Sequence, residues 1–428
     1  MYTNNPKYNK QQSIALLVVY CVVLIFCLSK DAIYSYDTYD YLRAMPYRQL
    51  GYVLFVKGFG FIFGSFFNYA VVGFQTVFSL FAVHYFLKNV SALFSLNLVS
   101  RLLLLAILIF PFFEPLSIAN NICTEGLSYG LYLIYIAIGI NILFNHRLDH
   151  IKYFAIIYII LVFVRGQFLF TTLIFAFTYA IVYKTELKSK KHILNVIILV
   201  IVPLVISSSE RTYHKLKDGV FKATPFSFVN ASTAAFYVSN KSDINTIKNN
   251  NDKAIFKLSY NVLEEKKLLL SSQNNAEHPY LFFHKNMPKI CNQTVHATGI
   301  DYYQALDSSI ANSYFNIETT CKNITLTLIK NNFSKWIRFY YANISYGFYS
   351  PIVLFIILFI FIFSFIKVVF SYNKWYGVLF LLSSLILANA MLVAFASHSI
   401  IRYLFYNYAL FFLIVITILK LFKHESKP

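Results

Sequence analysis

The chain has 428 residues, of which 58% are hydrophobic and 13% are charged, about half the charged fraction of an average soluble domain. Apolar runs of about 20 residues, enough to cross a bilayer, recur through most of the chain and exclude a water-soluble architecture. The net charge of +19 does not indicate nucleic-acid binding, because no basic face or binding motif accompanies it. Lys and Arg at the ends of membrane spans account for the charge.

The apolar runs predict an all-α, polytopic membrane protein with about ten transmembrane helices. The first run follows two lysines, as in a signal peptide. No small-residue cleavage site comes after it, so we interpret it as an uncleaved span. In chain order the predicted spans lie near residues 13–29, 68–87, 101–116, 119–144, 151–165, 167–183, 193–209, 350–368, 376–396 and 403–422.

A long polar segment divides the predicted spans into two groups. We expect an N-terminal transmembrane module at 1–209, whose first external loop covers 30–67. A small, mostly helical external domain follows at 210–347, and C-terminal transmembrane helices complete the chain at 348–428. The polar segment contains no glycine-rich phosphate loop, serine-hydrolase elbow or zinc-ligand spacing, so we look for the functional site elsewhere.

The basic residues orient the predicted spans. With the N-terminus inside, fifteen Lys and Arg outside the polar segment fall on the cytoplasmic side and six on the external side. The opposite orientation would violate the positive-inside rule. We therefore expect a multi-pass protein with both termini cytoplasmic and the large loop external; with a bacterial source assumed, the membrane is the inner membrane and the loop is periplasmic. The six external bases are Lys30, Arg43, Arg48, Lys57, Arg165 and Arg402, and the external acids are Asp31, Asp37, Asp40, Glu114 and Glu125.

This set of charges at the external ends of the spans marks the candidate site, because charges at membrane depth are costly and usually functional. Asp37 and Asp40 follow the first span and are three residues apart, so they share one face of a helix. Such a carboxylate can take a proton from a sugar or lipid hydroxyl, and an arginine such as Arg48 can bind a phosphate bidentately. An amphipathic helix lying on the membrane, with its acids facing water, explains the same pattern.

The order of the external motifs carries a family resemblance. One span is followed by Asp-x-x-x-Tyr-Leu from Asp37 and by Arg-x-x-Gly-Tyr-x-Leu-Phe from Arg48. This order resembles the C-type glycosyltransferase superfamily, in the bacterial branch similar to protein mannosyltransferases and lipid A aminoarabinose transferases. The resemblance covers roughly residues 13–210 and, loosely, the C-terminal spans. Gln49-Leu50 stands where the family usually has prolines. The similarity continues at Thr124-Glu125, Arg165-Gly166, Ser397-His398 and Arg402-Tyr403.

The resemblance implies an enzyme that moves a sugar from a polyprenyl-phosphate donor to a hydroxyl of a glycan, lipid or protein acceptor, with inversion. It implies that Asp37 is the general base and that Glu125 is a second catalytic acid. No cofactor is expected; a divalent metal held by Asp37 and Asp40 is an alternative that most members of this branch do not need. Membrane lipid is the other expected partner. The residues assigned to substrate binding are Asp40, Arg48, Lys57, Arg165, His398 and Arg402.

Several of these assignments have structural alternatives. Glu125 can form an ion pair with Arg165 or Arg402 that holds the bundle together, and either arginine can be a snorkelling residue at a span end. His398 fits an interfacial histidine as well as a phosphate ligand. A disulfide between Cys291 and Cys321 is left open, because connectivity does not follow from sequence.

Two other classes of membrane protein remain as alternatives to the glycosyltransferase. An O-antigen polymerase or ligase has a similar plan but relies on external arginines without an aspartate directly after the first span. A transporter or flippase would show internal repeats or charges near the middle of the bilayer, and the sequence shows neither.

Overall fold

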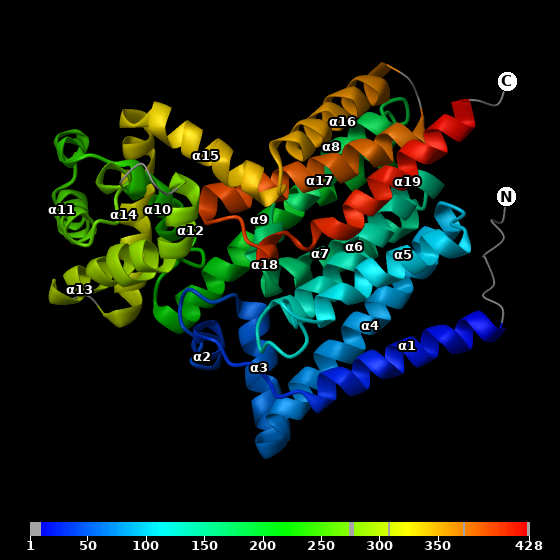
Figure 1. Ribbon diagram of the computed structural model, residues 1–428, viewed down its shortest axis with the longest axis horizontal. Coiled ribbons are helices and arrows are strands. Elements are labelled where there is room, and N and C mark those ends of the chain that lie inside the picture. The colour runs from blue at the N-terminus through cyan, green and yellow to red at the C-terminus, as the bar shows by residue number, and fades with distance from the viewer. Residues whose placement is uncertain (1–9, 274–277, 307–308, 371–372, 426–428) are drawn as a thin grey trace. The chain divides into compact units, whose positions relative to one another are not determined.

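Helices form the regular structure of this protein (Figure 1). The computed structural model describes residues 10–273, 278–306, 309–370 and 373–425. Within these ranges the single β-type pairing is an isolated bridge between Ile33 and Asn121. An apolar segment in lipid must satisfy its backbone groups internally, and a helix does so. The predicted all-α class is confirmed.

In the part of the chain that the structure describes, six segments are long and apolar enough to cross a membrane: α1, α3 with α4, α6, α9, α16 and α17. Each of the ten predicted spans falls on a helix, while their number as true spans stays a prediction. The helices are α1 (Lys10–Ser29), α2 (Tyr36–Leu42), α3 (Leu50–Phe63), α4 (Phe67–Leu93), α5 (Leu98–Ile109), α6 (Glu125–Asn145), α7 (Ile151–Val164), α8 (Thr171–Val182), α9 (Lys190–Asp218), α10 (Ser227–Val238), α11 (Asn250–Glu265), α12 (Pro279–Ile290), α13 (Ala297–Ala305), α14 (Ile310–Asn331), α15 (Phe333–Gly347), α16 (Pro351–Phe370), α17 (Lys374–Ala396), α18 (Ile401–Leu404) and α19 (Asn407–Glu425).

Several boundaries differ from the sequence prediction, and two of them bear on the site. The span predicted at 119–144 begins only at Glu125, because residues 113–124 form turns after Pro111 and Pro115, which cannot continue a helix. The predicted first external loop, 30–67, contains two helices, and the second of them, α3, is apolar.

The chain divides into two compact units. The first comprises Met1–Ile206, Ile356–Leu387 and Phe405–Pro428, and the second comprises Ser207–Phe355 and Ala388–Leu404. At the centre of the first unit lies α6, which packs against α4 and α7 and is buried along nearly its whole length.

Gln75 of α4 ties three segments of the first unit together. Its amide nitrogen donates to the carbonyls of Ala119 (2.9 Å) and Asn121 (3.1 Å), and its oxygen accepts from the Tyr52 hydroxyl (2.9 Å). The side chain is fully buried, so each of these bonds is shielded from water. Gly126 leaves the space for it: a Cβ at this glycine would lie 2.3 Å from Gln75 Cδ.

We expect Gly126→Ala to lower the free energy of unfolding of the protein by about 1–3 kcal/mol, because the methyl group displaces Gln75 from a packed position. Gly58→Ala is the matched control, since a Cβ there meets nothing within 4 Å and alanine favours the helix. Thermal unfolding in detergent compares the two. If the Gly126→Ala protein were as stable as the Gly58→Ala protein, this account of Gln75 would be contradicted.

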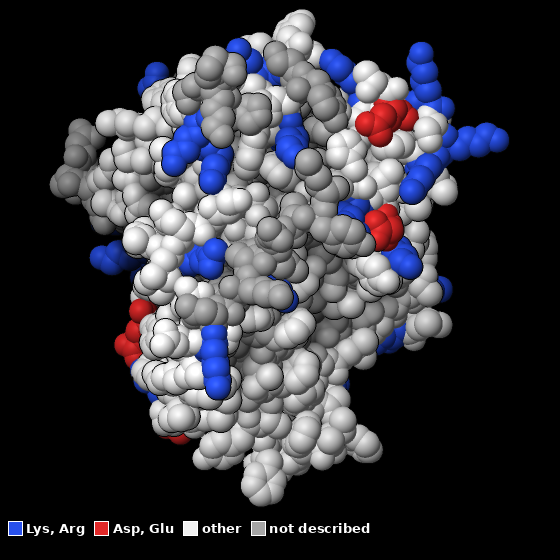
Figure 2. All heavy atoms as spheres, turned by 90° about the vertical axis from the view of Figure 1, so that its right-hand side faces the viewer, with Lys and Arg blue, Asp and Glu red and all other residues white. Residues whose placement is uncertain are grey.

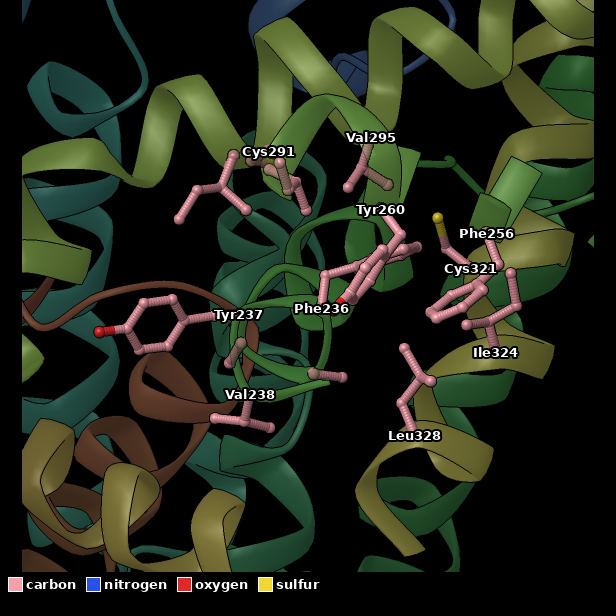
Figure 3. Close-up of a cluster of buried hydrophobic side chains, with 14 of the residues drawn as sticks. Phe236, Tyr237, Val238, Phe256, Tyr260, Cys291, Val295, Cys321, Ile324 and Leu328 are labelled. Carbon is pink, nitrogen blue, oxygen red and sulfur yellow. The ribbon is translucent and has the colours of Figure 1, made fainter. Parts of the chain in front are cut away.

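The second unit has a hydrophobic core of its own (Figure 3). Helix α10 packs against α14 in this cluster, while its Tyr237 points away from Ile324 and Leu328 and contacts the rings of Phe283 and Phe339. The disulfide left open by the sequence is not formed. Cys291 and Cys321 are free, buried thiols of the same core, and burial raises the pKa of Cys291 to about 12. Both therefore behave as small apolar residues. The core residues labelled in Figure 3 are Phe236, Tyr237, Val238, Phe256, Tyr260, Cys291, Val295, Cys321, Ile324 and Leu328.

Basic residues gather at the end of the first unit where α1 begins. Figure 2 views this end, and lysine and arginine side chains are spread over the visible surface with few acids among them. This is the distribution that the positive-inside rule associates with a cytoplasmic end.

Candidate functional site

In the first unit, hydrogen bonds join the loop that follows α1 to the loop that precedes α6. The Ile33 amide donates to the Asn120 carbonyl (2.8 Å), and the Ile122 amide donates to the Ile33 carbonyl (3.1 Å). The Thr38 hydroxyl adds a bond to the Ile122 carbonyl (2.9 Å). Because Thr38 lies in α2 and Ile122 lies three residues before α6, these bonds place Asp37 beside the start of α6.

Asp37 and Asp40 share one arginine. Both lie on the same face of α2, as their spacing predicted, and the Arg48 Nη2 atom is 2.7 Å from Asp37 Oδ1 and 2.6 Å from Asp40 Oδ2. The three side chains are 18–30% exposed, so the group is partly accessible to solvent. Burial alone lowers the pKa of Arg48, but the charge of Asp37 and the charge and hydrogen bond of Asp40 outweigh burial and raise this pKa. We call Asp37, Asp40 and Arg48 the acid cluster.

The loop that carries Arg48 is held by aromatic rings. The guanidinium carbon of Arg48 lies 5.1 Å from the ring centre of Tyr41 and 5.0 Å from that of Tyr47, within cation–π range. Two buried polar atoms here, Arg48 Nε and Gln49 Oε1, form no hydrogen bond with the described residues. Buried polar atoms normally have partners. The loop thus offers a donor and an acceptor to a bound molecule.

Glu125 and Arg165 form a buried ion pair beside the acid cluster. Arg165 Nη1 lies 2.8 Å from Glu125 Oε1 and donates to the Thr124 hydroxyl at 2.7 Å, and Arg165 Nε donates to Gln167 at 2.8 Å. The two charged side chains are only 4% and 9% exposed. Of the partners that the sequence left open for Glu125, the structure forms the pair with Arg165.

Tyr41 and Cys123 lie between the acid cluster and this ion pair. The Cys123 Sγ atom lies 3.9 Å from Asp37 Oδ2, and buried Tyr41 interacts electrostatically with Asp37, Glu125 and Arg48. Burial raises the pKa of Tyr41, and the neighbouring Cys123 thiol adds to this rise. The sequence analysis singled out neither side chain. Tyr41 is part of the Asp-x-x-x-Tyr-Leu motif, which was a signal for it, whereas Cys123 has none beyond preceding Thr124-Glu125.

Close backbone packing fixes α3 against the end of α7. A Cβ at Gly51 would lie 2.8 Å from the carbonyl carbon and oxygen of Phe163, so only glycine allows this approach. On the other side of the Arg48 loop, Ala44 directly follows the end of α2 and has a φ of 54°, in the left-handed region that is unfavourable for alanine.

The other residues predicted for the site lie on different elements of the protein. Lys57 is exposed on α3, two turns along the helix from its start. His398 and Arg402 belong to the second unit. There the His398 ring lies 4.8 Å from the His284 ring, and its Nδ1 atom is 3.2 Å from the His284 carbonyl oxygen. Their assignment to substrate binding stays a prediction.

We expect His398 to make the second unit sensitive to acid. Burial, with repulsion from His284, lowers the pKa of His398 to about 4. Between pH 6.5 and about 4, His398 is therefore protonated in the unfolded chain but mostly neutral in the folded chain. The free energy of unfolding falls as the pH falls through this range. Thermal unfolding at pH 7.5 and pH 5 should show a smaller acid loss for His398→Gln than for the unchanged protein. His146→Gln, at an exposed histidine, is the control, and equal acid losses in all three proteins would refute the role of His398.

In the acid cluster an arginine stands between the two carboxylates. Among the residues that the structure describes, no group of three or more His, Cys, Asp or Glu side chains is arranged to hold one. The position between Asp37 and Asp40, which a divalent ion would share, is taken by the guanidinium of Arg48. Metal binding there would require this arginine to leave.

The chain was compared with known proteins by sequence and by structure. No protein-family model, no curated protein and no solved structure matches it. The resemblance carried by the external motifs therefore stays a prediction, and the functional argument rests on the geometry of the acid cluster and of the Glu125–Arg165 pair.

Proposed function

We propose that this protein is a membrane glycosyltransferase that uses a polyprenyl-phosphate sugar as donor and a hydroxyl group as acceptor. One observation carries the proposal: two carboxylates and one arginine, all partly exposed, are assembled at one end of an apolar helical bundle. A transporter of a lipid or ion needs charged groups along its pathway. A pair of fixed acids at the membrane surface suits proton removal from a hydroxyl instead.

In the proposed reaction Asp37 is the general base. Its Oδ1 atom accepts a hydrogen bond from Arg48, and we assign the proton of the acceptor hydroxyl to Oδ2, which lies 3.9 Å from Cys123 Sγ. As that proton moves to Asp37, the acceptor oxygen forms a bond to the anomeric carbon and the bond from this carbon to the phosphate oxygen breaks. The electron pair of the broken bond leaves with polyprenyl phosphate, and the sugar is inverted at the anomeric carbon.

We assign the Glu125–Arg165 pair a positioning role in this reaction. The sequence analysis assigned Arg165 to substrate binding, but its guanidinium already bonds Glu125, Thr124 and Gln167. A buried pair beside Asp37 fixes the start of α6 and thereby the loop that contacts α2. Lys57, His398 and Arg402 keep their predicted assignment to substrate binding.

The proposed location is a bacterial inner membrane with the acid cluster on the periplasmic side. The basic end shown in Figure 2 supports this orientation, because it is the end where α1 begins. Asp37 follows the other end of the same helix. In this orientation the donor is a lipid-linked sugar at the outer surface, and the acceptor is a glycan, lipid or protein hydroxyl in the periplasm.

Hydrolysis of the donor tests the proposal even though the acceptor is not identified. Water can attack the anomeric carbon in place of the acceptor hydroxyl, although more slowly. The full-length protein in lipid nanodiscs is mixed with radiolabelled polyprenyl-phosphate hexoses and pentoses, and released sugar is measured. We expect at least one donor to be cleaved in a reaction that requires Asp37. Cleavage of a pyrophosphate-linked sugar alone would favour the polymerase or ligase class, and no cleavage of any donor would contradict the proposal.

A further inference from the structure

An apolar groove of about 360 Å³ lies in the first unit between α4, α6 and α7. Its volume falls at the lower end of the range of small-molecule sites, about 300–1,000 Å³. Phe81 of α4, Ile138 of α6 and Ile156 of α7 line its walls. Tyr85, His150 and Tyr153 also line it, and they supply its polar groups.

The groove opens between two surfaces that suit contact with lipid. On α4, Phe74, Val77 and Phe81 are 46–60% exposed, and their spacing places them in one stripe along the helix. On α7, Tyr153, Ile156 and Ile160 are 43–52% exposed and form a second stripe with the same spacing. In a protein of this composition such stripes face the hydrocarbon of the membrane, so a hydrocarbon chain can enter the groove from the side.

One end of the groove is polar and basic. Lys88 is exposed one helical turn beyond Tyr85, and exposed Lys152 lies over the Tyr153 ring at 4.9 Å. The amino-terminal end of the 14-residue helix α7 lies here as well, and the helix dipole favours an anion at this end. The acid Asp149 precedes His150, and its carboxylate lies 3.6 Å from His150 Nε2.

This basic end is one membrane thickness away from the acid cluster. Tyr34, just before α2, donates a 2.6 Å hydrogen bond to Asn68 at the start of α4, whereas Lys88 is near the other end of α4. The 20 residues from Asn68 to Lys88 span about 30 Å of helix, the thickness of the hydrocarbon core. A head group at Lys88 therefore belongs to the leaflet opposite Asp37.

We propose that the groove binds one anionic phospholipid, with an acyl chain between α4 and α7 and the phosphate between Lys88 and Lys152. Tyr85 and Tyr153 lie at the depth where aromatic residues meet head groups. Two lysines and a helix amino terminus select a net negative head group over a zwitterionic one. This site is separate from the proposed transferase site and does not depend on that function.

Lipid retention measures the head-group selection. The full-length protein is taken from nanodiscs made of equal parts phosphatidylglycerol and phosphatidylcholine, and the lipids that remain bound in detergent are identified by native mass spectrometry. We expect one phosphatidylglycerol to be retained. The Lys88→Gln/Lys152→Gln variant should bind it about 30-fold more weakly, since each lysine near a head group contributes about a factor of five. The Lys188→Gln/Lys190→Gln variant removes the same charge from exposed lysines elsewhere and should bind it unchanged.

A second pair of variants tests the groove itself. Ile156→Trp fills the groove from a lipid-facing position, and Ile160→Trp places the same side chain one turn further along the stripe, outside the groove lining. We expect lipid retention to fall for the first variant and to persist for the second. Equal retention of phosphatidylcholine by the unchanged protein would overturn the proposal. So would equal losses in the two lysine double variants, or equal retention by the two tryptophan variants.

Discussion

Asp37→Asn should lower the rate of donor cleavage about 10²–10⁴-fold, the usual contribution of a general base. The amide has nearly the shape of the carboxylate but does not accept the proton of the attacking hydroxyl. Its side-chain oxygen still accepts a hydrogen bond from Arg48, so the loop from Ala44 to Gln49 keeps its partner. The initial rate of sugar release in nanodiscs, measured at saturating donor, gives the effect on the chemical step.

Asp31→Asn is the matched control for this prediction, because Asp31 is an exposed acid of the same external loop, outside the acid cluster. It should retain the full rate. Asp40→Asn separates the two carboxylates of the cluster: it removes one charge from Arg48 but leaves the proposed base in place, so we expect a smaller loss than at Asp37. A folded Asp37→Asn protein with the full rate of cleavage would refute the assignment of the base.

Arg165→Met should destabilise the first unit by about 3–5 kcal/mol. The substitution leaves the Glu125 carboxylate buried without its charge partner, and an uncompensated buried charge is among the most destabilising changes in proteins. Denaturant unfolding of the detergent-solubilised protein, followed by circular dichroism of the helices, measures the change.

The double variant Glu125→Gln/Arg165→Met removes both charges. It therefore separates the contribution of the ion pair from the cost of leaving one buried charge without a partner. With both charges removed, most of the lost stability should return, because neither side chain is then a buried ion. Glu114→Gln gives a comparison at the surface: Glu114 pairs with Lys30 at 2.9 Å but is highly exposed, so its loss should leave the unfolding curve unchanged. A double variant as unstable as Arg165→Met would show that the stability resides in shape rather than in charge.

The helices were largely predictable from sequence, because a run of apolar residues has few alternatives to a helix in lipid. The start of α6 was not. Residues 119–124 were included in the predicted span, but side-chain bonds from Gln75, and backbone bonds with Ile33, hold them in turns. Such bonds come from segments distant in the chain, and hydropathy contains no information about them.

The candidate site was predictable in its residues but not in its pairings. The spacing of Asp37 and Asp40 was enough to place them on one face of a helix. It gave no reason for a single arginine to contact both, and Arg48 was assigned to a substrate instead. In the same way Arg165 and Arg402 were equivalent partners for Glu125 in the sequence. The choice depends on which helix ends pack together, here those of α6 and α7.

The close contact at Gly51 determines which side of the Arg48 loop can give way. Because the start of α3 is pressed against the Phe163 carbonyl, separation there would require α7 to shift as well. On the other side of the loop, the Ala44 backbone has a φ of 54°, which is unfavourable for alanine. In the proposed reaction, an opening for a bulky sugar would therefore come from the α2 side of the loop, and it would carry Asp37 and Asp40 away from Arg48, which stays beside α3. The proposed base would then separate from its arginine whenever the entrance opened and pair with it again whenever the entrance closed.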